Sequence, residues 1–348
     1  MNSYSANSTV SMLAPNTDTF EVQRSTKAGV ITLIISIVLL GLSISMPFWA
    51  GSSYLRLFTE LACYMAMAQM WNLLGGYGGL VSIGQQAFIG IGGYSLFVWA
   101  NFVGVDPFTS VALGGIIAAL FAVPISQLVF RLPGGAFAIG TWAIAEVLRL
   151  VVANTYVLGG GSGASLTALR GIDRATRESV TFWIAVAAAF GSVLLVYMLL
   201  RSRFGLALTA IRDSEVASRS QGIDVKKIKF LVYIISSFGF GIAGALYFLA
   251  NIRISPDAAF GISWSPLIIF MVIIGGAGTI EGPLIGAILF FVLSKIFEDY
   301  GTWYLASLGL LAVIVTIWFP KGLWGLVVDH FDLRLFPVQR RLRMPENK

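Results

Sequence analysis

Residues 183–250 read WIAVAAAFGSVLLVYMLLRSRFGLALTAIRDSEVASRSQGIDVKKIKFLVYIISSFGFGIAGALYFLA, and this stretch decides the fold. Two apolar runs, near 181–200 and 229–250, flank a polar segment in which charged and apolar residues alternate at helical spacing. A transmembrane helix needs about 20 mostly apolar residues. The stretch therefore predicts two membrane-spanning helices joined by an amphipathic helix near 205–220 outside the membrane.

The whole chain has the composition of a membrane protein. Of its 348 residues, 57% are hydrophobic and 11% are charged, and the mean hydropathy is +0.83. Soluble domains carry about a quarter charged residues. The apolar runs are as long as helices, and the alternating strands of a barrel are absent. We therefore predict an all-α polytopic membrane protein with about ten transmembrane helices, within a range of eight to ten. The expected spans are 28–48, 55–74, 80–101, 109–130, 135–153, 181–200, 229–250, 264–280, 283–298 and 304–320.

Two glycine clusters interrupt the predicted spans. One cluster lies at 75–79 and the other at 275–282. Such clusters mark either ordinary loops or helices that are broken within the membrane. The sequence leaves both possibilities open.

The positions of Lys and Arg predict the orientation. The N-terminal tail holds two, the turn at 131–134 one, the segment 201–229 seven and the C-terminal end from Lys321 six, which together are 16 of 23. Cytoplasmic loops are enriched in these residues, so both termini are predicted to be cytoplasmic. The expected organisation is a disordered cytoplasmic tail (1–27), a transmembrane domain (28–326) and a basic cytoplasmic tail (327–348). The transmembrane domain would include a cytoplasmic loop (201–228), an outer loop (154–180) and an outward-facing Glu298-Asp299 turn.

Composition also excludes several functions. The only cysteine is Cys63 and the only histidine is His330, so no internal disulfide and no His/Cys metal site can form. No Gly-Lys dipeptide occurs, so the chain has no Walker A loop for ATP. The net charge of +6 reflects membrane topology and does not indicate nucleic-acid binding. We expect no bound metal or cofactor, and a carboxylate pair drawn from Glu60, Glu146 and Glu281 is the only enzymatic chemistry that remains.

Candidate residues for a translocation path fall into two groups. Glycines allow close helix packing or an unwound, substrate-facing backbone, and the polar residues between them favour a cavity. This group is Gly75, Gly76, Gly79, Ser82, Gln85 and Gln86. Glu146 and Arg149 lie three apart on one helix face, either as a contact along the path or as a structural pair. Glu60 has Arg56 one turn away as an expected partner.

The polar segment of the opening stretch has two interpretations. A basic amphipathic helix can lie on anionic lipid. However, Asp213 and Glu215 interrupt its positive face, and its apolar side consists largely of small residues. This pattern favours a protein partner.

Five motifs resemble one known family. The segment RFGLALTAIRDSEVASRSQGI resembles the cytoplasmic coupling loop of permease subunits of ATP-binding-cassette importers, in particular those for branched-chain amino acids. The motifs WNLLGGYGGLVSIGQQAFIGIGGY, LPGGAFAIGTWAIAEVLRLVVAN with LGGGSG, SWSPLIIFMVIIGGAGTIEGPLIGA and FPKGLWGL resemble further parts of that family. Together they cover nearly all of 55–326, and the match is closer to the longer of the two paired permeases.

The resemblance implies a mechanism and a set of partners. Two cytoplasmic ATP-binding subunits, a sister permease and an external solute-binding protein would act with this chain in the bacterial cytoplasmic (inner) membrane, and the ATPase would dock on the coupling helix. The implied coupling residues are Phe204, Gly205, Ala210, Ile211, Arg212, Asp213, Ser214, Glu215, Ala217 and Gly222. The importer family in general places a Gly six residues after the loop Glu, whereas here Gly222 follows Glu215 by seven, which leaves the register of individual contacts open.

Alternatives to this function are also open. Relatives of the implied family carry branched-chain amino acids, other amino acids, urea or short amides, so a small neutral or zwitterionic solute is expected. A secondary transporter or channel that works without an ATPase is a rival class. It would use carboxylates in the spans and would leave the segment 203–224 unexplained.

Overall fold

The computed structural model describes residues 21–23, 27–297, 303–319, 321–331, 335–336 and 341–343. Nearly all of them are helical, which confirms the all-α fold class. The main helices are α1 (Lys27–Ser45), α2 (Ser52–Trp71), α3 (Gln86–Val98), α4 (Pro107–Val129), α5 (Gly135–Ala153), α6 (Arg174–Arg201), α7 (Arg203–Asp213), α8 (Glu215–Ser220), α9 (Val225–Asn251), α10 (Pro256–Phe260), α11 (Trp264–Gly275), α12 (Glu281–Ile296), α13 (Trp303–Trp318) and α14 (Gly322–Phe331).

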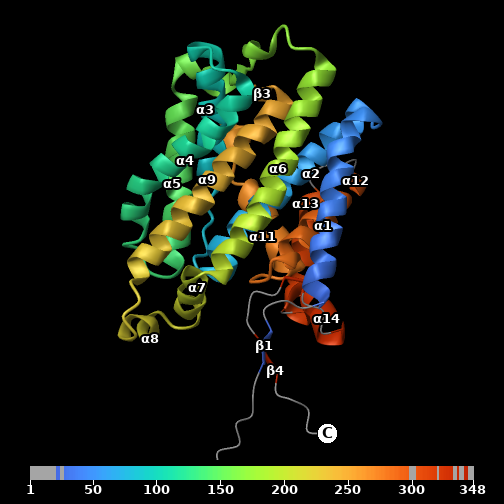
Figure 1. The fold of residues 1–348 in the computed structure, drawn as a ribbon. Helices are drawn as coiled ribbons and strands as arrows, with labels where there is room; N and C mark the ends of the chain where they lie inside the picture. The colour runs from blue at the N-terminus through green and yellow to red at the C-terminus, as the bar shows by residue number, and fades with distance from the viewer. Residues whose placement is uncertain are drawn as a thin grey trace, which may run out of the picture.

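The long helices form one bundle whose short elements collect at its two ends (Figure 1). Helices α7, α8 and α14 lie at one end, and β1 (Glu21–Gln23) and β4 (Arg341–Arg343) pair beyond it. The strands β2 (Ala164–Ser165) and β3 (Arg253–Ile254) pair with each other, and β3 lies at the opposite end. Both terminal strands thus lie on the side of the 201–228 loop, as the charge distribution predicts. The Glu298-Asp299 turn and most of both tails lie outside the described residues.

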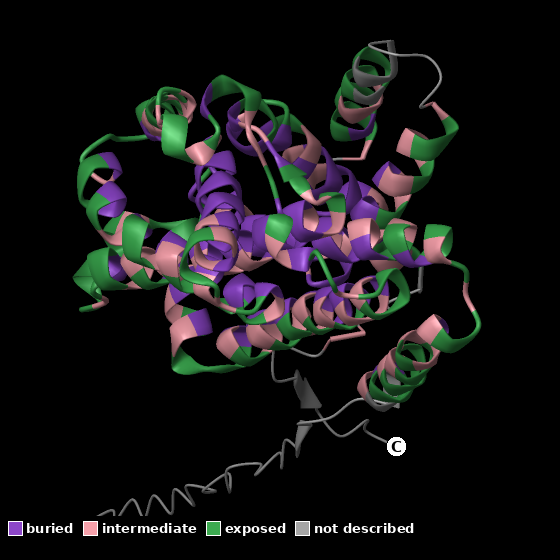
Figure 2. Cartoon of the chain, turned by 90° about the horizontal axis from the view of Figure 1, so that it is seen from above, coloured by how far each residue is buried: buried purple, intermediate pink, exposed green. Residues whose placement is uncertain are grey.

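Eight segments of the described chain are long and apolar enough to span a membrane. They include α1, α4, α5, α6 and α9, and their number lies within the predicted range. The predicted spans 55–74 and 283–298 correspond to α2 and α12, which are not among these eight. Figure 2 shows that buried residues gather in the centre of the bundle, whereas the outlying helices are largely exposed.

Helices α3, α4 and α9 pack closely because they carry glycines where they cross. A Cβ atom on Gly114 of α4 would lie 2.8 Å from the carbonyl oxygen of Gly92 in α3. A Cβ atom on Gly241 of α9 would lie 2.5 Å from the Cβ of Ala118 in α4. Small residues let helix backbones approach in this way. Close packing therefore explains these glycines, which lie outside the two clusters.

Both glycine clusters break a helix, and this corrects two predicted spans. Helix α2 continues as the π-helix η2 (Asn72–Tyr77), the chain then runs without regular structure to residue 85, and α3 begins at Gln86. The span predicted at 80–101 is therefore wrong at its start. The span predicted at 264–280 is wrong at its end, because α11 stops at Gly275 and Gly276 has a φ of +131°. Positive φ values are easily reached only by glycine.

The irregular segment 78–85 is largely buried, apart from exposed Gly79 and Val81, and side chains satisfy part of its backbone. The indole Nε1 of Trp71 donates to the carbonyl of Ser82 at 3.0 Å. The hydroxyl of Ser265 donates to the carbonyl of Ile83 at 2.5 Å. Non-helical backbone is tolerated at membrane depth only where protein or water satisfies its polar groups.

The amphipathic segment consists of two helices, whereas the sequence predicted one helix near 205–220. Ser214 is extended, with φ −159° and ψ +109°, and separates α7 from α8. Its hydroxyl caps α8 by accepting from the Ala217 N–H at 3.3 Å. A serine that caps a helix must leave helical geometry, so Ser214 breaks the predicted helix. Gly222, with φ +83°, follows the end of α8, where glycine is common because it readily adopts a left-handed conformation.

Candidate functional site

The α7–α8 segment has one buried face and one exposed face. Leu208 and Ile211 are buried against the rest of the bundle, with exposed fractions of 0% and 4%. Leu206 and Val216 are exposed by 70% and 77%. The segment lies outside the membrane-spanning helices, so two large apolar side chains exposed together on it suit a protein partner.

Charged side chains fix α8 to the start of α9. The Glu215 carboxylate accepts from Lys229 Nζ at 2.6 Å and from Arg219 Nη2 at 2.5 Å. The hydrogen bond from Lys229 is the main cause that holds the pKa of Glu215 below its ordinary value. Glu215 therefore remains charged at neutral pH and keeps α8 in place, so its role is internal to this chain.

Arg212 links α7 to both glycine clusters. Its Nη1 donates to the carbonyl of Gly76 at 3.3 Å. A Cβ atom on Gly278 would lie 3.1 Å from Arg212 Nη1, and one on Gly79 would lie 3.6 Å from its Cγ. A single side chain of α7 thus touches the breaks that follow α2 and α11.

The same two breaks are tied directly to each other. The Asn72 side-chain amide donates to the carbonyl of Thr279 at 2.7 Å and accepts from the Gly278 N–H at 2.8 Å. Gln69 Nε2 donates to the carbonyl of Ile280 at 2.5 Å. Asn72 and Gln69 are fully buried. We use the name glycine junction for residues 72–79, residues 276–281 and Arg212, which contact one another.

The glycine junction also meets the C-terminal part of the chain. A Cβ atom on Gly322, at the start of α14, would lie 2.5 Å from Gly276 Cα. The buried Glu281 carboxylate accepts from the Phe336 N–H at 3.0 Å. A displacement of α7 would therefore act on α2, α11, α12 and α14 together.

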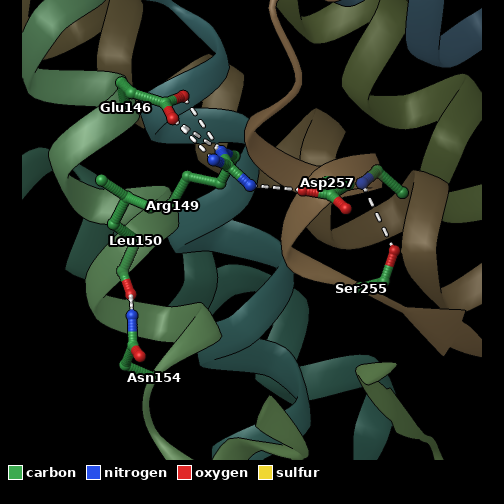
Figure 3. A network of polar contacts seen from close by, with 7 residues as sticks. Glu146, Arg149, Leu150, Asn154, Ser255 and Asp257 are labelled. Atoms are coloured by element: carbon green, nitrogen blue, oxygen red, sulfur yellow. Dashed lines mark hydrogen bonds and ion pairs between the residues drawn. The ribbon is translucent and has the colours of Figure 1, made fainter. Parts of the chain in front are cut away.

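At the opposite end, an ionic network joins α5 to α10 (Figure 3). Arg149 donates from Nη2 to Glu146 Oε1 at 2.6 Å and from Nη1 to Asp257 Oδ1 at 2.5 Å. The predicted Glu146–Arg149 pair is thus present, and Asp257 is a third member that the sequence did not suggest. Charged groups within a membrane segment are costly and usually face a partner or a water-filled cavity.

The expected Arg56–Glu60 pair is wrong. Arg56 instead donates to Glu178 of α6, from Nε at 2.9 Å and from Nη2 at 2.8 Å. Glu60 accepts from the Tyr64 hydroxyl at 2.8 Å and pairs with Lys295 of α12 at 3.4 Å. Arg56 and Glu60 therefore each form an ion pair with a residue of another helix, instead of the expected ion pair with each other. Glu60, Glu146 and Glu281 each have a different partner.

The predicted site residues lie in several regions. Gly75, Gly76, Gly79 and Arg212 belong to the glycine junction, and Glu146 and Arg149 belong to the ionic network at the opposite end. Ser82, Gln85 and Gln86 are buried in the bundle, exposed by 0–1%, and the side-chain oxygen Oε1 of Gln86 lies 2.6 Å from Oγ of Ser265. Among the coupling residues, Gly205 and Ile211 are buried, Phe204, Ala210 and Glu215 are half-buried, and Arg212, Asp213, Ser214, Ala217 and Gly222 are exposed.

Sequence reasoning did not single out Leu206 and Val216 as exposed contacts, nor Gln69 and Asn72 in the junction. Gln69 and Asn72 did carry a signal, because they are amides within an otherwise apolar run. Leu206 and Val216 carried none, since only the packing of α7 and α8 shows which apolar side chains remain exposed.

These features define a polytopic membrane protein with the two-helix segment α7–α8 at one end. A family model described as the permease component of branched-chain amino acid transport systems matches residues 53–318, so the chain belongs to that family. It is accordingly a transport permease of the ATP-binding-cassette class and not an enzyme, as the motifs indicate.

Curated relatives agree with this assignment. The chain is 28% identical over 324 residues to the high-affinity branched-chain amino acid transport system permease protein LivM of Escherichia coli K12, covering 86% of this chain and 76% of the relative. A probable LivM of Methanocaldococcus jannaschii is 26% identical over 271 residues, or 72% and 77% of the two chains. The probable LivH of that organism is 32% identical over only 129 residues, or 37% and 38%. The chain thus resembles LivM, the longer permease. No solved structure matches it significantly.

Proposed function

We propose that this chain is the membrane-spanning permease of an ATP-driven importer that moves branched-chain amino acids delivered by an external binding protein. The observation that carries the proposal is the α7–α8 segment. It exposes Leu206 and Val216 to a partner on one side, and on the other side its Arg212 donates to Gly76 in the glycine junction. The branched-chain amino acids come from the descriptions of the family and the LivM relatives.

The proposed energy source is a pair of cytoplasmic ATP-binding subunits. The chain itself needs no cofactor, because ATP binds to those subunits. When the two subunits close, the α7–α8 segment moves with them. Arg212 then carries the shift to the glycine junction, and the helices that leave the junction change their tilt. Packed interfaces rearrange between discrete states, so the solute path alternates between outward and inward access.

A sister permease is the proposed partner of α5. This helix carries Glu146 and Arg149 within its span, yet only 17% of its spanning window is buried. Exposed apolar side chains, among them Ile139, Val147 and Val151, lie on the same helix. Charged groups on a lipid-facing helix are costly, so a second permease covering α5 explains both features. The proposed location is the bacterial cytoplasmic (inner) membrane.

Purification from membranes of the source organism tests this assembly. A tagged copy of the chain is expected to bring down a second permease and two ATP-binding subunits, identified by mass spectrometry. Deletion of its gene is expected to abolish uptake of labelled leucine at low concentration and to leave urea uptake unchanged. Purification of the chain without any ATP-binding subunit would contradict the proposal. Loss of urea uptake alone would assign the importer to another solute.

A further inference from the structure

The ionic network of α5 and α10 contains hydrogen-bonding groups that have no partner in the described part of the chain. Arg149 has five N–H groups, and it donates to Glu146 from Nε and Nη2 and to Asp257 from Nη1. One N–H on each Nη nitrogen therefore has no partner in the described part of the chain. Asp257 contributes only Oδ1 to the network, so its Oδ2 is also available. Figure 3 shows Arg149 between its two carboxylates.

The network is accessible from the side of Asp257. The Asp257 side chain is 78% exposed, whereas those of Glu146 and Arg149 are 41% and 26% exposed. It lies at the end of the bundle opposite the coupling segment, since Asp257 follows β3 by three residues. A solute that approaches this end therefore meets Asp257 first and Arg149 behind it.

A buried hydroxyl adjoins the network and has no partner in the described chain. The Tyr94 ring stacks on Phe260 of α10, with centroids 5.9 Å apart. Tyr94 is 5% exposed, and its hydroxyl makes no hydrogen bond within the described residues. It lies near enough to Asp257 for the two groups to interact electrostatically. A buried polar group of this kind is costly unless something pairs with it.

We propose that Arg149, Asp257 and Glu146 form an outer binding site for a zwitterionic amino acid. The α-carboxylate of the solute binds the free N–H groups of Arg149, and its α-ammonium binds the carboxylate of Asp257. The buried Tyr94 hydroxyl is a further hydrogen-bonding group beside the site. This inference rests on the proposed function and specifies where the permease first holds its solute.

The charges of the network suit a zwitterion better than an uncharged solute. One guanidinium between two carboxylates has a net charge of −1, and it offers both a cation and an anion at the surface. A zwitterion brings one charge of each sign, so the net charge stays at −1 and each charge of the solute meets an opposite charge of the network. Hydrogen bonds to charged groups are the strong ones, and a solute such as urea has no charge to pair with the network.

The test compares two probes, leucine and leucinamide, which differ in the carboxylate. Equilibrium binding of each is measured on the detergent-purified transporter complex without binding protein. The unaltered complex is expected to bind leucine at least about tenfold more tightly than leucinamide, because a hydrogen bond to a charged group is lost. Arg149→Gln is expected to abolish this preference, and Asp257→Asn is expected to weaken both probes. Arg170→Gln, which changes an exposed outer arginine, serves as the control.

Two outcomes would overturn this inference. The first is an unchanged preference for leucine over leucinamide in Arg149→Gln, including an equal loss for both probes, which is expected if the network only holds α5 against α10. The second is the absence of leucine binding to the unaltered complex. The proposed function is tested separately by ATP-driven leucine uptake in the unaltered transporter. If this uptake is observed, the proposed function holds even where the binding-site inference fails. If it is not observed, the proposed function is contradicted as well.

Discussion

Replacing both Leu206 and Val216 by aspartate is expected to abolish ATP-driven uptake and to reduce binding of the ATP-binding subunits at least about a hundredfold. Each large apolar side chain contributes about 1.5–3 kcal/mol when it is fully buried, and about 1.4 kcal/mol corresponds to a tenfold change in affinity. Both side chains are exposed in this chain alone. The substitutions should therefore spare folding and act only on the partner interface.

The measurement is co-purification of the ATP-binding subunits with the tagged permease, together with leucine uptake. Val157→Asp is the matched control, since Val157 is an exposed valine (72%) outside the coupling segment, in the stretch between α5 and α6. The control should bind and transport as the unaltered protein does. Full recovery of ATP-binding subunits with the double variant would show that they dock elsewhere.

Replacing Asn72 by leucine is expected to uncouple ATP hydrolysis from transport. Leucine has the same number and branching of side-chain heavy atoms as asparagine but leaves the Gly278 N–H and the Thr279 carbonyl without their bonds to residue 72. Each unpaired buried group costs about 1–3 kcal/mol, so the two glycine clusters should separate. The α7–α8 surface is unchanged, and the ATP-binding subunits should still bind.

The coupling ratio, leucine molecules transported per ATP hydrolysed, measures this effect. It should fall at least about tenfold in Asn72→Leu while hydrolysis continues. Asn154→Leu is the control, because exposed Asn154 only donates to the carbonyl of Leu150 within its own helix. A normal ratio in Asn72→Leu would show that the junction does not transmit the movement of α7.

The regular spans could be predicted from sequence because apolar length determines them. The predicted span 135–153 coincides with α5, where Gly134 has a φ of +53° before the helix. The breaks could be suspected from their glycines, but their paths could not be predicted. The route of 78–85 depends on hydrogen bonds from Trp71 and Ser265, and Ser265 lies far away in the sequence.

The site could be predicted only in part, for a related reason. Arg149 was found from its chemistry and Arg212 from the family resemblance, but their partners Asp257 and Gly76 lie far away in the sequence. Ile211 was expected to face the ATPase and is instead buried inside the chain. An amphipathic pattern shows that a helix has two faces, whereas the packing of the whole bundle decides which face is covered.

The most direct test of the account is leucine uptake into proteoliposomes. One set of vesicles contains this chain with its sister permease, the ATP-binding subunits and a loaded binding protein, and the other contains this chain alone. Uptake is expected only in the first set and only when ATP is supplied on the side of the ATP-binding subunits. Uptake by the chain alone, driven by a proton or sodium gradient without ATP, would contradict the account.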